Sequence, residues 1–130
     1  MSFLEGLLWL TLNIYHEARG EPEIGQLAVA HVTLNRAIIR QKSVAEIVRA
    51  PYQFSWTQQK RSYLPTEINA FQQSLSMALK ALTTPDFTQG STYYHHLRVN
   101  PHWAADMTFV ARYGSHKFYR RDSNAFPDNF

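Results

Sequence analysis

The part of the sequence with the clearest capacity for chemistry is the stretch NIYHEARGE, residues 13–21, in which a histidine and a glutamate stand side by side. The residues before it are mostly apolar, and Gly20 and Pro22 after it are typical of the end of a helix. Glu17 is therefore expected in the last turn of an enclosed helix. Because burial disfavours an ionised carboxylate, we expect the pKa of Glu17 to be raised. A carboxyl group that keeps its proton near neutral pH can act as a general acid.

Other charged groups nearby leave alternatives for this carboxylate. Glu17 could instead form a surface ion pair with Arg19 or another arginine, which is a common structural arrangement. Glycosidases that use two carboxylates place the second roughly 5 to 10 Å from the first, and Glu21 and Glu23 are the only acids close in sequence. Both are expected in the first turn of the next helix, where the helix dipole stabilises negative charge. The sequence therefore favours a single essential acid, without excluding assistance from Glu21 or Glu23.

The chain has six histidines, four of which are His95, His96, His102 and His116. The sequence HEARG differs from the zinc motif H-E-x-x-H because position 20 is a glycine. Adjacent histidines in a strand also point to opposite faces of a sheet. We therefore predict no metal and no other cofactor, with a zinc site as a minor alternative. His31, on the apolar side of a predicted helix, is expected to form structural hydrogen bonds.

A segment framed by two prolines, residues 51–65, is rich in aromatic and polar side chains and is predicted to be a loop. Phe54 and Trp56 have no helical periodicity there that would explain them as core residues, and Ser55 lies between them. Such side chains can line a groove that stacks on the faces of sugar rings. Beside basic residues they can also stack on nucleobases, so the aromatic pattern alone does not choose between these two ligands.

The spacing of apolar residues predicts a mainly helical chain. Helices are expected in the apolar N-terminal segment that Gly20 and Pro22 end, over residues 23–40, and over residues 44–50. A capping box of Ser43 and Glu46 introduces the third of these helices. Thr66 is predicted to cap a fourth helix. The apolar face of that helix is formed by Ile68, Phe71, Leu75, Leu79 and Leu82.

Two short strands are predicted over residues 92–99 and 116–120, with a helix over 101–113 between them. In that helix Trp103, Met107 and Val110 would share one face, and Gly114 would end it. The two strands can still pair antiparallel. We therefore expect one compact unit that is mainly α with a small antiparallel β element (α+β), as a single domain over residues 1–130.

Composition narrows the class of protein further. The 130 residues are 45% hydrophobic and 18% charged, as in an ordinary globular domain. No apolar run reaches the roughly 18 residues that a membrane span needs, and the N-terminus has neither the basic start nor the cleavage site of a signal peptide. The absence of cysteine excludes disulfides and thiol nucleophiles. A formal charge of +3 and a pI near 9.3 predict a mildly basic surface that would attract polyanions.

Four blocks of the sequence carry a recognisable pattern: IYHEARGEPEIGQLAVAHVTLNR, QFSW, YYHHLRVNPHWA and ARYGSHKFY. They span Ile14 to Tyr119, and in this order they resemble the SleB/CwlJ cell-wall hydrolase family. The first block contains the family's Glu-Ala-Arg-Gly-Glu motif, and the last contains its Gly-x-His-x-Phe-Tyr strand. The segment before QFSW is shorter than in spore enzymes of the family, and no separate wall-binding domain is evident. A compact phage endolysin therefore fits this pattern better than a spore-germination enzyme.

The resemblance implies a fold like that of lysozymes and lytic transglycosylases. It also implies cleavage of the β-1,4 bond between N-acetylmuramic acid and N-acetylglucosamine in peptidoglycan, with Glu17 as the catalytic acid. In lytic transglycosylases one acid is enough, because the same carboxylate takes the proton of the muramic acid 6-hydroxyl as a 1,6-anhydro ring closes. The lack of a convincing second acid favours this reaction over hydrolysis by a muramidase, which stays the alternative.

The resemblance also implies roles for other residues. The substrate-binding positions that it indicates are Phe54, Ser55, Trp56, Tyr94, His95, His116 and Tyr119. Asn35 and Arg36 match the first motif block but are expected to be structural.

The expected partner is the glycan strand of bacterial peptidoglycan, with no nucleic acid, no stable membrane insertion and a monomeric state. Because no signal peptide is evident, we expect synthesis in the host cytoplasm and later release to the cell wall or periplasm. A zinc-dependent peptidoglycan amidase and a basic nucleic-acid-binding module are the rival functions. Both are less well supported, since the usual sequence signatures of each are absent.

Overall fold

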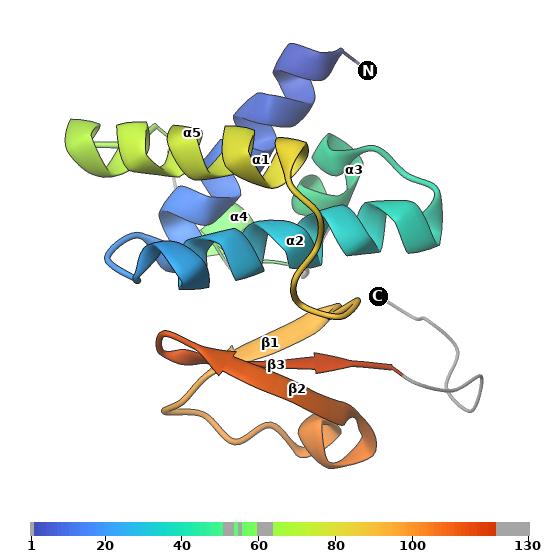
Figure 1. Ribbon diagram of the computed structural model, residues 1–130. Helices are drawn as coiled ribbons and strands as arrows, with labels where there is room; N and C mark the ends of the chain where they lie inside the picture. The colour runs from blue at the N-terminus through green and yellow to red at the C-terminus, as the bar shows by residue number, and fades with distance from the viewer. Residues whose placement is uncertain (1, 51–53, 55, 60–63, 122–130) are drawn as a thin grey trace.

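The computed structural model describes residues 2–50, 54, 56–59 and 64–121, which form a helical layer above a small sheet (Figure 1). The helices are α1 (Phe3–Ala18), α2 (Glu23–Arg40), α3 (Val44–Arg49), α4 (Trp56–Gln59) and α5 (Ile68–Thr83). The sheet consists of β1 (Tyr93–His96), β2 (Thr108–Tyr113) and β3 (His116–Arg120), and a 3-10 helix, η1 (His102–Asp106), precedes β2. The fold class predicted from the sequence, mainly α with a small antiparallel β element, is confirmed.

Helix α1 is the centre of the helical layer. Its C-terminal half is buried, with Leu10 and Ile14 fully enclosed, whereas its first two turns expose Phe3, Leu4 and Leu8. Leu10 and Ile14 pack in one cluster with apolar side chains of α2 and α5. This cluster consists of Leu10, Ile14, Leu27, Ala30, Met77, Ala78 and Ala81. The part of α1 that precedes Glu17 is therefore packed between α2 and α5, as the apolar sequence of this helix predicts.

Helices α2 and α3 match the sequence prediction closely. Helix α2 covers the predicted residues 23–40, and α3 begins with both hydrogen bonds of the predicted capping box. The amide of Glu46 donates to Ser43 Oγ at 3.1 Å, and the amide of Ser43 donates to Glu46 Oε1 at 3.1 Å. These reciprocal bonds satisfy backbone donors that a helix start would otherwise leave unpaired.

Helix α5 begins differently from the prediction, because Thr66 does not cap it. The cap position is Glu67, which makes no side-chain cap bond. Instead, the phenol oxygen of Tyr15 accepts hydrogen bonds from the amides of Thr66 at 3.2 Å and Glu67 at 3.1 Å. A buried side chain of α1 thus satisfies the start of α5, which is a tertiary contact that local sequence rules do not contain.

The buried face of α5 was also predicted wrongly. Ser74, Met77, Ala78 and Ala81 are the buried residues of α5, whereas Ile68, Leu79 and Leu82 of the predicted apolar face are exposed. Phe71 and Leu75 of the predicted face are partly buried. Small side chains at the contact allow α5 to lie close to α1 and α2.

The C-terminal part of the chain contains a third strand where a helix was predicted over residues 101–113. Only η1 is helical there, and Thr108–Tyr113 forms β2. β-branched and aromatic residues favour a strand in this segment, and β3 supplies the partner. The sheet order is β1-β3-β2, and the predicted antiparallel pairing of the two other strands is confirmed, with Tyr94 opposite Phe118. Gly114 turns the chain between β2 and β3 at a φ of 61°, a conformation that glycine adopts easily.

Part of the predicted loop over residues 51–65 is also helical. Helix α4 occupies Trp56–Gln59, so the loop prediction is wrong for these four residues. Most of the remaining residues of that segment lie outside the described residues.

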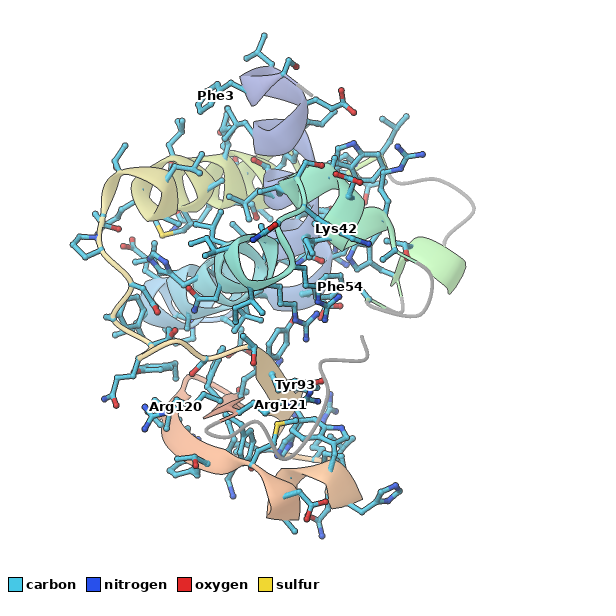
Figure 2. The ribbon with its side chains drawn as sticks, turned by 90° about the vertical axis from the view of Figure 1, so that its right-hand side faces the viewer. Phe3, Lys42, Phe54, Tyr93, Arg120 and Arg121 are labelled. Carbon is cyan, nitrogen blue, oxygen red and sulfur yellow. The ribbon has the colours of Figure 1, made fainter. Side chains whose placement is uncertain are left out.

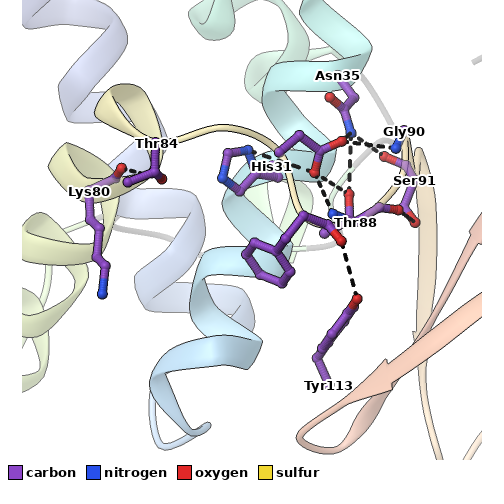
Figure 3. A network of polar contacts seen from close by, with 10 residues as sticks. His31, Asn35, Lys80, Thr84, Thr88, Gly90, Ser91 and Tyr113 are labelled. Carbon is purple, nitrogen blue, oxygen red and sulfur yellow. Dashed lines mark hydrogen bonds and ion pairs between the residues drawn. The ribbon is translucent and has the colours of Figure 1, made fainter.

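A polar network joins α2 to the segment between α5 and β1 (Figure 3). The carboxylate of Asp86 accepts hydrogen bonds from the Thr88 amide at 2.7 Å, the Gly90 amide at 2.9 Å and the Asn35 amide group at 3.1 Å. Asn35 also donates to the carbonyl oxygen of Ser91 at 2.9 Å. This network fixes the path of the chain into β1, the strand that carries Tyr94.

Replacement of Asp86 by Asn tests this network. Burial by itself raises the pKa of Asp86, but the bonds from Thr88, Gly90 and Asn35 outweigh burial, and the pKa is lowered. The stability that these bonds supply is therefore present above the ordinary aspartate pKa of about 4 and is lost as the pH falls through the lower, folded-state value. Asp86→Asn is expected to lower the free energy of unfolding by about 1 to 2 kcal/mol at pH 7.

Urea unfolding at pH 7 and pH 3 measures this effect. The difference from the parent protein should be smaller at pH 3 than at pH 7, because a larger fraction of the Asp86 carboxylates is protonated at the lower pH. Asp106→Asn, which changes an exposed acid at the end of η1, is the matched control and should have little effect at either pH. An Asp86→Asn protein that is as stable as the parent at pH 7 would contradict the role of the network.

Candidate active site

Glu17 lies in the last turn of α1, facing the sheet, and its side chain is half-buried. The phenol of Tyr94, in β1, donates a hydrogen bond to Glu17 Oε1. Burial raises the pKa of Glu17, while the Tyr94 hydrogen bond and the charge of Arg36 pull it down to a smaller extent. The direction predicted from the sequence is therefore confirmed. A partly accessible carboxyl group with a raised pKa is suited to donate a proton.

Tyr94 is placed so that it acts only as a donor toward Glu17. Its ring packs against Phe118, with ring centroids 5.4 Å apart, and meets the edge of His116 at 5.3 Å. Burial and the neighbouring Glu17 raise the pKa of Tyr94 well above its ordinary value. The phenol therefore stays protonated, and its hydroxyl group orients the carboxyl group of Glu17 in both ionisation states.

Arg36 supplies a positive charge near Glu17 and Tyr94. It is 6% exposed and its Nε donates to the carbonyl oxygen of Thr92 at 2.8 Å. Its guanidinium carbon lies 5.2 Å from the ring of Phe54 and 5.5 Å from the ring of Tyr93. In Figure 2 Phe54 belongs to the helical layer and Tyr93 to the sheet, so Arg36 bridges the two layers. The sequence predicted a structural role for Arg36 but not its electrostatic effect on Glu17.

The alternative in which Arg19 pairs with Glu17 does not hold. Arg19 Nε lies 3.4 Å from Glu67 Oε1, and the guanidinium group covers the ring of Tyr15 at 4.5 Å. Arg19 is therefore used to join α1 to the start of α5. This leaves Glu17 in contact with a neutral donor rather than in a surface ion pair.

Glu21 has a structural contact that the sequence did not reveal. It precedes Pro22, the cap of α2, and so lies outside the first turn in which it was predicted. Glu21 Oε1 accepts a hydrogen bond from the amide of Ser115 at 2.7 Å, and His116 Nδ1 is 3.9 Å away. A side chain at position 114 would collide with this carboxylate, which explains the glycine there. Glu21 thus fastens the α1–α2 turn to the β2–β3 turn, while Glu23 is exposed at the start of α2, as predicted.

The predicted substrate-binding residues of the sheet divide between its two faces. Tyr94 and His116 lie on the face toward the helices, because Tyr94 contacts both Glu17 and His116. His95 and Tyr119 are bonded to each other at 2.9 Å on the other face, where both contact Trp103. Successive side chains of a strand point to opposite faces, so Tyr94 and His95 cannot share one surface. Only Tyr94 and His116 are brought toward Glu17.

Phe54 and Trp56, which were predicted to line a sugar-binding groove, are more buried than expected. Phe54 and Trp56 are each 3% exposed and belong to a core cluster with Leu12, Ile47 and Val48. Their burial makes them supports behind the site rather than an open platform in this structure. Ser55 lies outside the described residues. Whether Phe54 or Trp56 contacts a glycan stays a prediction.

The remaining chemistry of the described residues is limited. They contain no group of three or more histidine, cysteine, aspartate or glutamate side chains arranged to hold a metal ion. His31 is buried on α2, with its Nδ1 3.9 Å from Asp86 Oδ1, but its Nε2 has no hydrogen-bond partner among the described residues, so the predicted structural hydrogen bonds of His31 are not found. Within the part of the chain that the structure describes, no helix combines the length and apolar character needed to cross a bilayer.

Comparison with known proteins identifies a protein family and a relative that this chain resembles. The family model described as Cell Wall Hydrolase matches residues 20–119, so the match begins three residues after Glu17. A spore cortex-lytic enzyme of Halalkalibacterium halodurans is 32% identical over 112 residues, which are 81% of this chain and 32% of that protein. The chain therefore spans about a third of the length of this relative.

Two solved structures share the fold. The catalytic domain of the germination-specific lytic transglycosylase SleB from Bacillus anthracis has a TM-score of 0.77 and 27% identity, and the match covers 92% of this chain and 97% of that one. The catalytic domain of the Bacillus cereus SleB protein has a TM-score of 0.77 and 25% identity, with coverage of 92% and 93%. The described fold is thus similar to that of the SleB catalytic domains.

A double-mutant cycle of Tyr94→Phe and Glu17→Gln tests the pairing at this site. A glutamine accepts the same neutral hydrogen bond as a protonated glutamate, so the coupling energy reports only the ionised carboxylate. Urea unfolding should give a coupling of about 1 kcal/mol above the pKa of Glu17 and almost none below it. Tyr119→Phe, which alters a phenol on the other face of the sheet, should not couple to Glu17→Gln at either pH. A Tyr94–Glu17 coupling that does not change with pH would contradict the assignment.

Proposed function

Since the chain belongs to the Cell Wall Hydrolase family, we propose that it is a peptidoglycan-cleaving glycosidase. The bond cut is the β-1,4 bond between N-acetylmuramic acid and N-acetylglucosamine, and Glu17 is the acid. The observation that carries this proposal is the half-buried carboxyl group of Glu17, whose raised pKa and hydrogen bond from Tyr94 suit it to donate a proton. Its position in the last turn of α1, facing the sheet, supports the same role.

The proposed reaction begins with proton transfer from Glu17 to the glycosidic oxygen. The bond from this oxygen to C1 of the muramic acid residue breaks, N-acetylglucosamine leaves with a free 4-hydroxyl group, and positive charge develops at C1. The carboxylate of Glu17 then accepts the proton of the muramic acid 6-hydroxyl, whose oxygen bonds to C1 and closes a 1,6-anhydro ring. Glu17 is thereby returned to its protonated state, and no water is consumed.

The surroundings of Glu17 fit both halves of this cycle. Burial favours the protonated form that the first step needs. Once the proton has left, the Tyr94 hydroxyl group and the charge of Arg36 stabilise the carboxylate, because both favour the ionised form. The opposing effects keep the pKa above its ordinary value without making proton donation prohibitive.

The described acids support a one-carboxylate mechanism. Glu21 is held by the Ser115 amide, and Glu23 is exposed at the start of α2. A carboxylate engaged by a backbone amide and one exposed on a helix are poorly suited to activate water, which supports attack by the 6-hydroxyl group over hydrolysis. A hydrolysing muramidase, in which water takes the place of that hydroxyl group, is the alternative.

We further propose that the protein acts as a compact bacteriolytic enzyme of the endolysin type. In this proposal it reaches the wall only after release from the cytoplasm in which it is made, and its basic surface promotes adsorption to anionic wall polymers. A zinc amidase would be silenced by a chelator, and a nucleic-acid-binding module would bind single strands in a salt-dependent manner. Lysis that persists in a chelator, with no binding of single strands at low salt, separates the proposal from both rivals.

Glu17→Gln is the direct test of the acid. The substitution keeps the shape and the neutral hydrogen bond to Tyr94 but removes the proton cycle, so we expect lysis of isolated cell walls to fall by at least roughly a thousandfold. The clearing of a wall suspension measures this loss. Glu23→Gln, which removes an exposed acid from α2, should retain activity. Because burial penalises the Glu17 carboxylate, a folded Glu17→Gln protein should be at least as stable as the parent at neutral pH. Substantial lysis by that folded variant would defeat the proposal.

The reaction products distinguish the two chemistries. A transglycosylase yields muropeptides ending in 1,6-anhydro-N-acetylmuramic acid, each one water lighter than the reducing product of a muramidase. Mass spectrometry of digested peptidoglycan is expected to find the anhydro form as the main product. If the main product is reducing and incorporates oxygen from ¹⁸O-labelled water, the one-carboxylate transglycosylase mechanism is wrong, although the bond assignment stands.

A further inference from the structure

Asn13 is a buried polar residue that the proposed mechanism leaves without a role. It lies in the middle of α1 and its side chain is 0% exposed. It precedes Glu17 by four residues, and residues separated by four in a helix lie on the same face. A buried amide group is stabilised only when its donors and acceptors are used, so the contacts of Asn13 define what it does.

Both ends of the Asn13 amide group are bonded to other helices. Its Oδ1 accepts a hydrogen bond from the indole Nε1 of Trp56 at 2.8 Å, and its Nδ2 donates to Thr33 Oγ1 at 3.2 Å. An indole N–H can only donate, so the Asn13 oxygen must face Trp56. The contact therefore has one orientation, and no apolar side chain can replace it.

Trp56 is also held by the residue next to the acid. Its ring stacks on His16, with centroids 4.4 Å apart and an angle of 26° between the planes. The indole is thus held at its edge by Asn13 and over its face by His16, both on α1. Trp56 is the first residue of α4 and packs in the same cluster as Phe54. The position of Trp56 relative to Glu17 is consequently set from within α1 itself.

We propose that Asn13 is a positioning residue that fixes Trp56 and the start of α4 against the last turn of α1, and thereby shapes the substrate-binding side of Glu17. Asn13 does not touch the reacting atoms. The inference rests on the proposed function, since it requires that Glu17 acts on a bound glycan. It goes beyond that function by giving the local geometry a polar anchor, the hydrogen bond between Asn13 and Trp56.

The anchor is tested first without any activity measurement. In a ¹H–¹⁵N spectrum the indole proton of Trp56 can be assigned by its loss in Trp56→Phe, and its exchange with solvent can be followed. Asn13→Leu, which is close in shape but cannot accept a hydrogen bond, should speed this exchange by roughly tenfold or more. Thr33→Val removes the other partner of Asn13 and keeps the Trp56 bond, so it should leave the exchange within about twofold. Unchanged exchange in Asn13→Leu would overturn the anchor.

The consequence for the substrate is tested with soluble glycan strands. Asn13→Leu should raise KM by roughly tenfold with kcat within about threefold, because the acid keeps its surroundings while the binding side is misplaced. Thr33→Val is expected to lower stability without changing KM. Should Asn13→Leu fail to fold, Trp56→Phe breaks the same hydrogen bond from its other end and should show the same rise in KM. A normal KM in a folded variant whose indole bond is broken would overturn the positioning role.

These outcomes are separable from failure of the proposed function. If the parent protein does not cleave glycan strands, the proposed function and the substrate part of this inference both fail, whereas the exchange measurement still decides whether Asn13 anchors Trp56. If the parent cleaves and Asn13→Leu differs from it only in stability, the positioning role alone is wrong.

Discussion

The hydrogen bond between the Tyr94 hydroxyl group and Glu17 joins residues 77 positions apart and brings the helical layer into contact with the sheet at the candidate acid. The pKa values of both partners are raised in the folded protein. Burial raises the pKa of the carboxyl group, and burial together with that carboxyl group raises the pKa of the phenol. Both groups therefore hold their protons to a higher pH than free side chains do, and the site depends on water being held away from one side of Glu17.

The rest of the structure serves to keep the two layers in this relation. Glu21 bonds the α1–α2 turn to the amide of Ser115, and Arg36 bonds α2 to the carbonyl oxygen of Thr92. Asn35 bonds α2 to the carbonyl oxygen of Ser91, in the segment that leads into β1. Three polar residues of the first motif block thus hold the sheet at three points, so they have a structural role, to which Arg36 adds its effect on the pKa of Glu17.

The sequence predicted what is encoded locally. The end of α1, the whole of α2 and the capping box of α3 follow from apolar spacing, glycine and proline positions and short polar motifs, and so did the raised pKa of Glu17. It failed where a distant partner decides the outcome. Trp103, Met107 and Val110 are spaced as on a helix, yet residues 108–113 pair with β3 because that strand is available beside them. The cap of α5 comes from Tyr15. The contacts of Glu17 with Tyr94 and Arg36 likewise exist only after the layers have packed. The separation of Tyr94 from His95, in contrast, follows from strand alternation and is contained in the sequence.

The most direct measurement of the central claim is the titration of the Glu17 side chain itself. In protein labelled with ¹³C at the glutamate carboxyl carbon, the Glu17 signal can be assigned by its absence from Glu17→Gln and followed from acidic to alkaline pH. The account predicts a midpoint clearly above the ordinary glutamate value of about 4.3, because burial outweighs the effects of Tyr94 and Arg36. A midpoint at or below that value would mean that the carboxylate is already ionised where a proton donor is required, and would contradict the account.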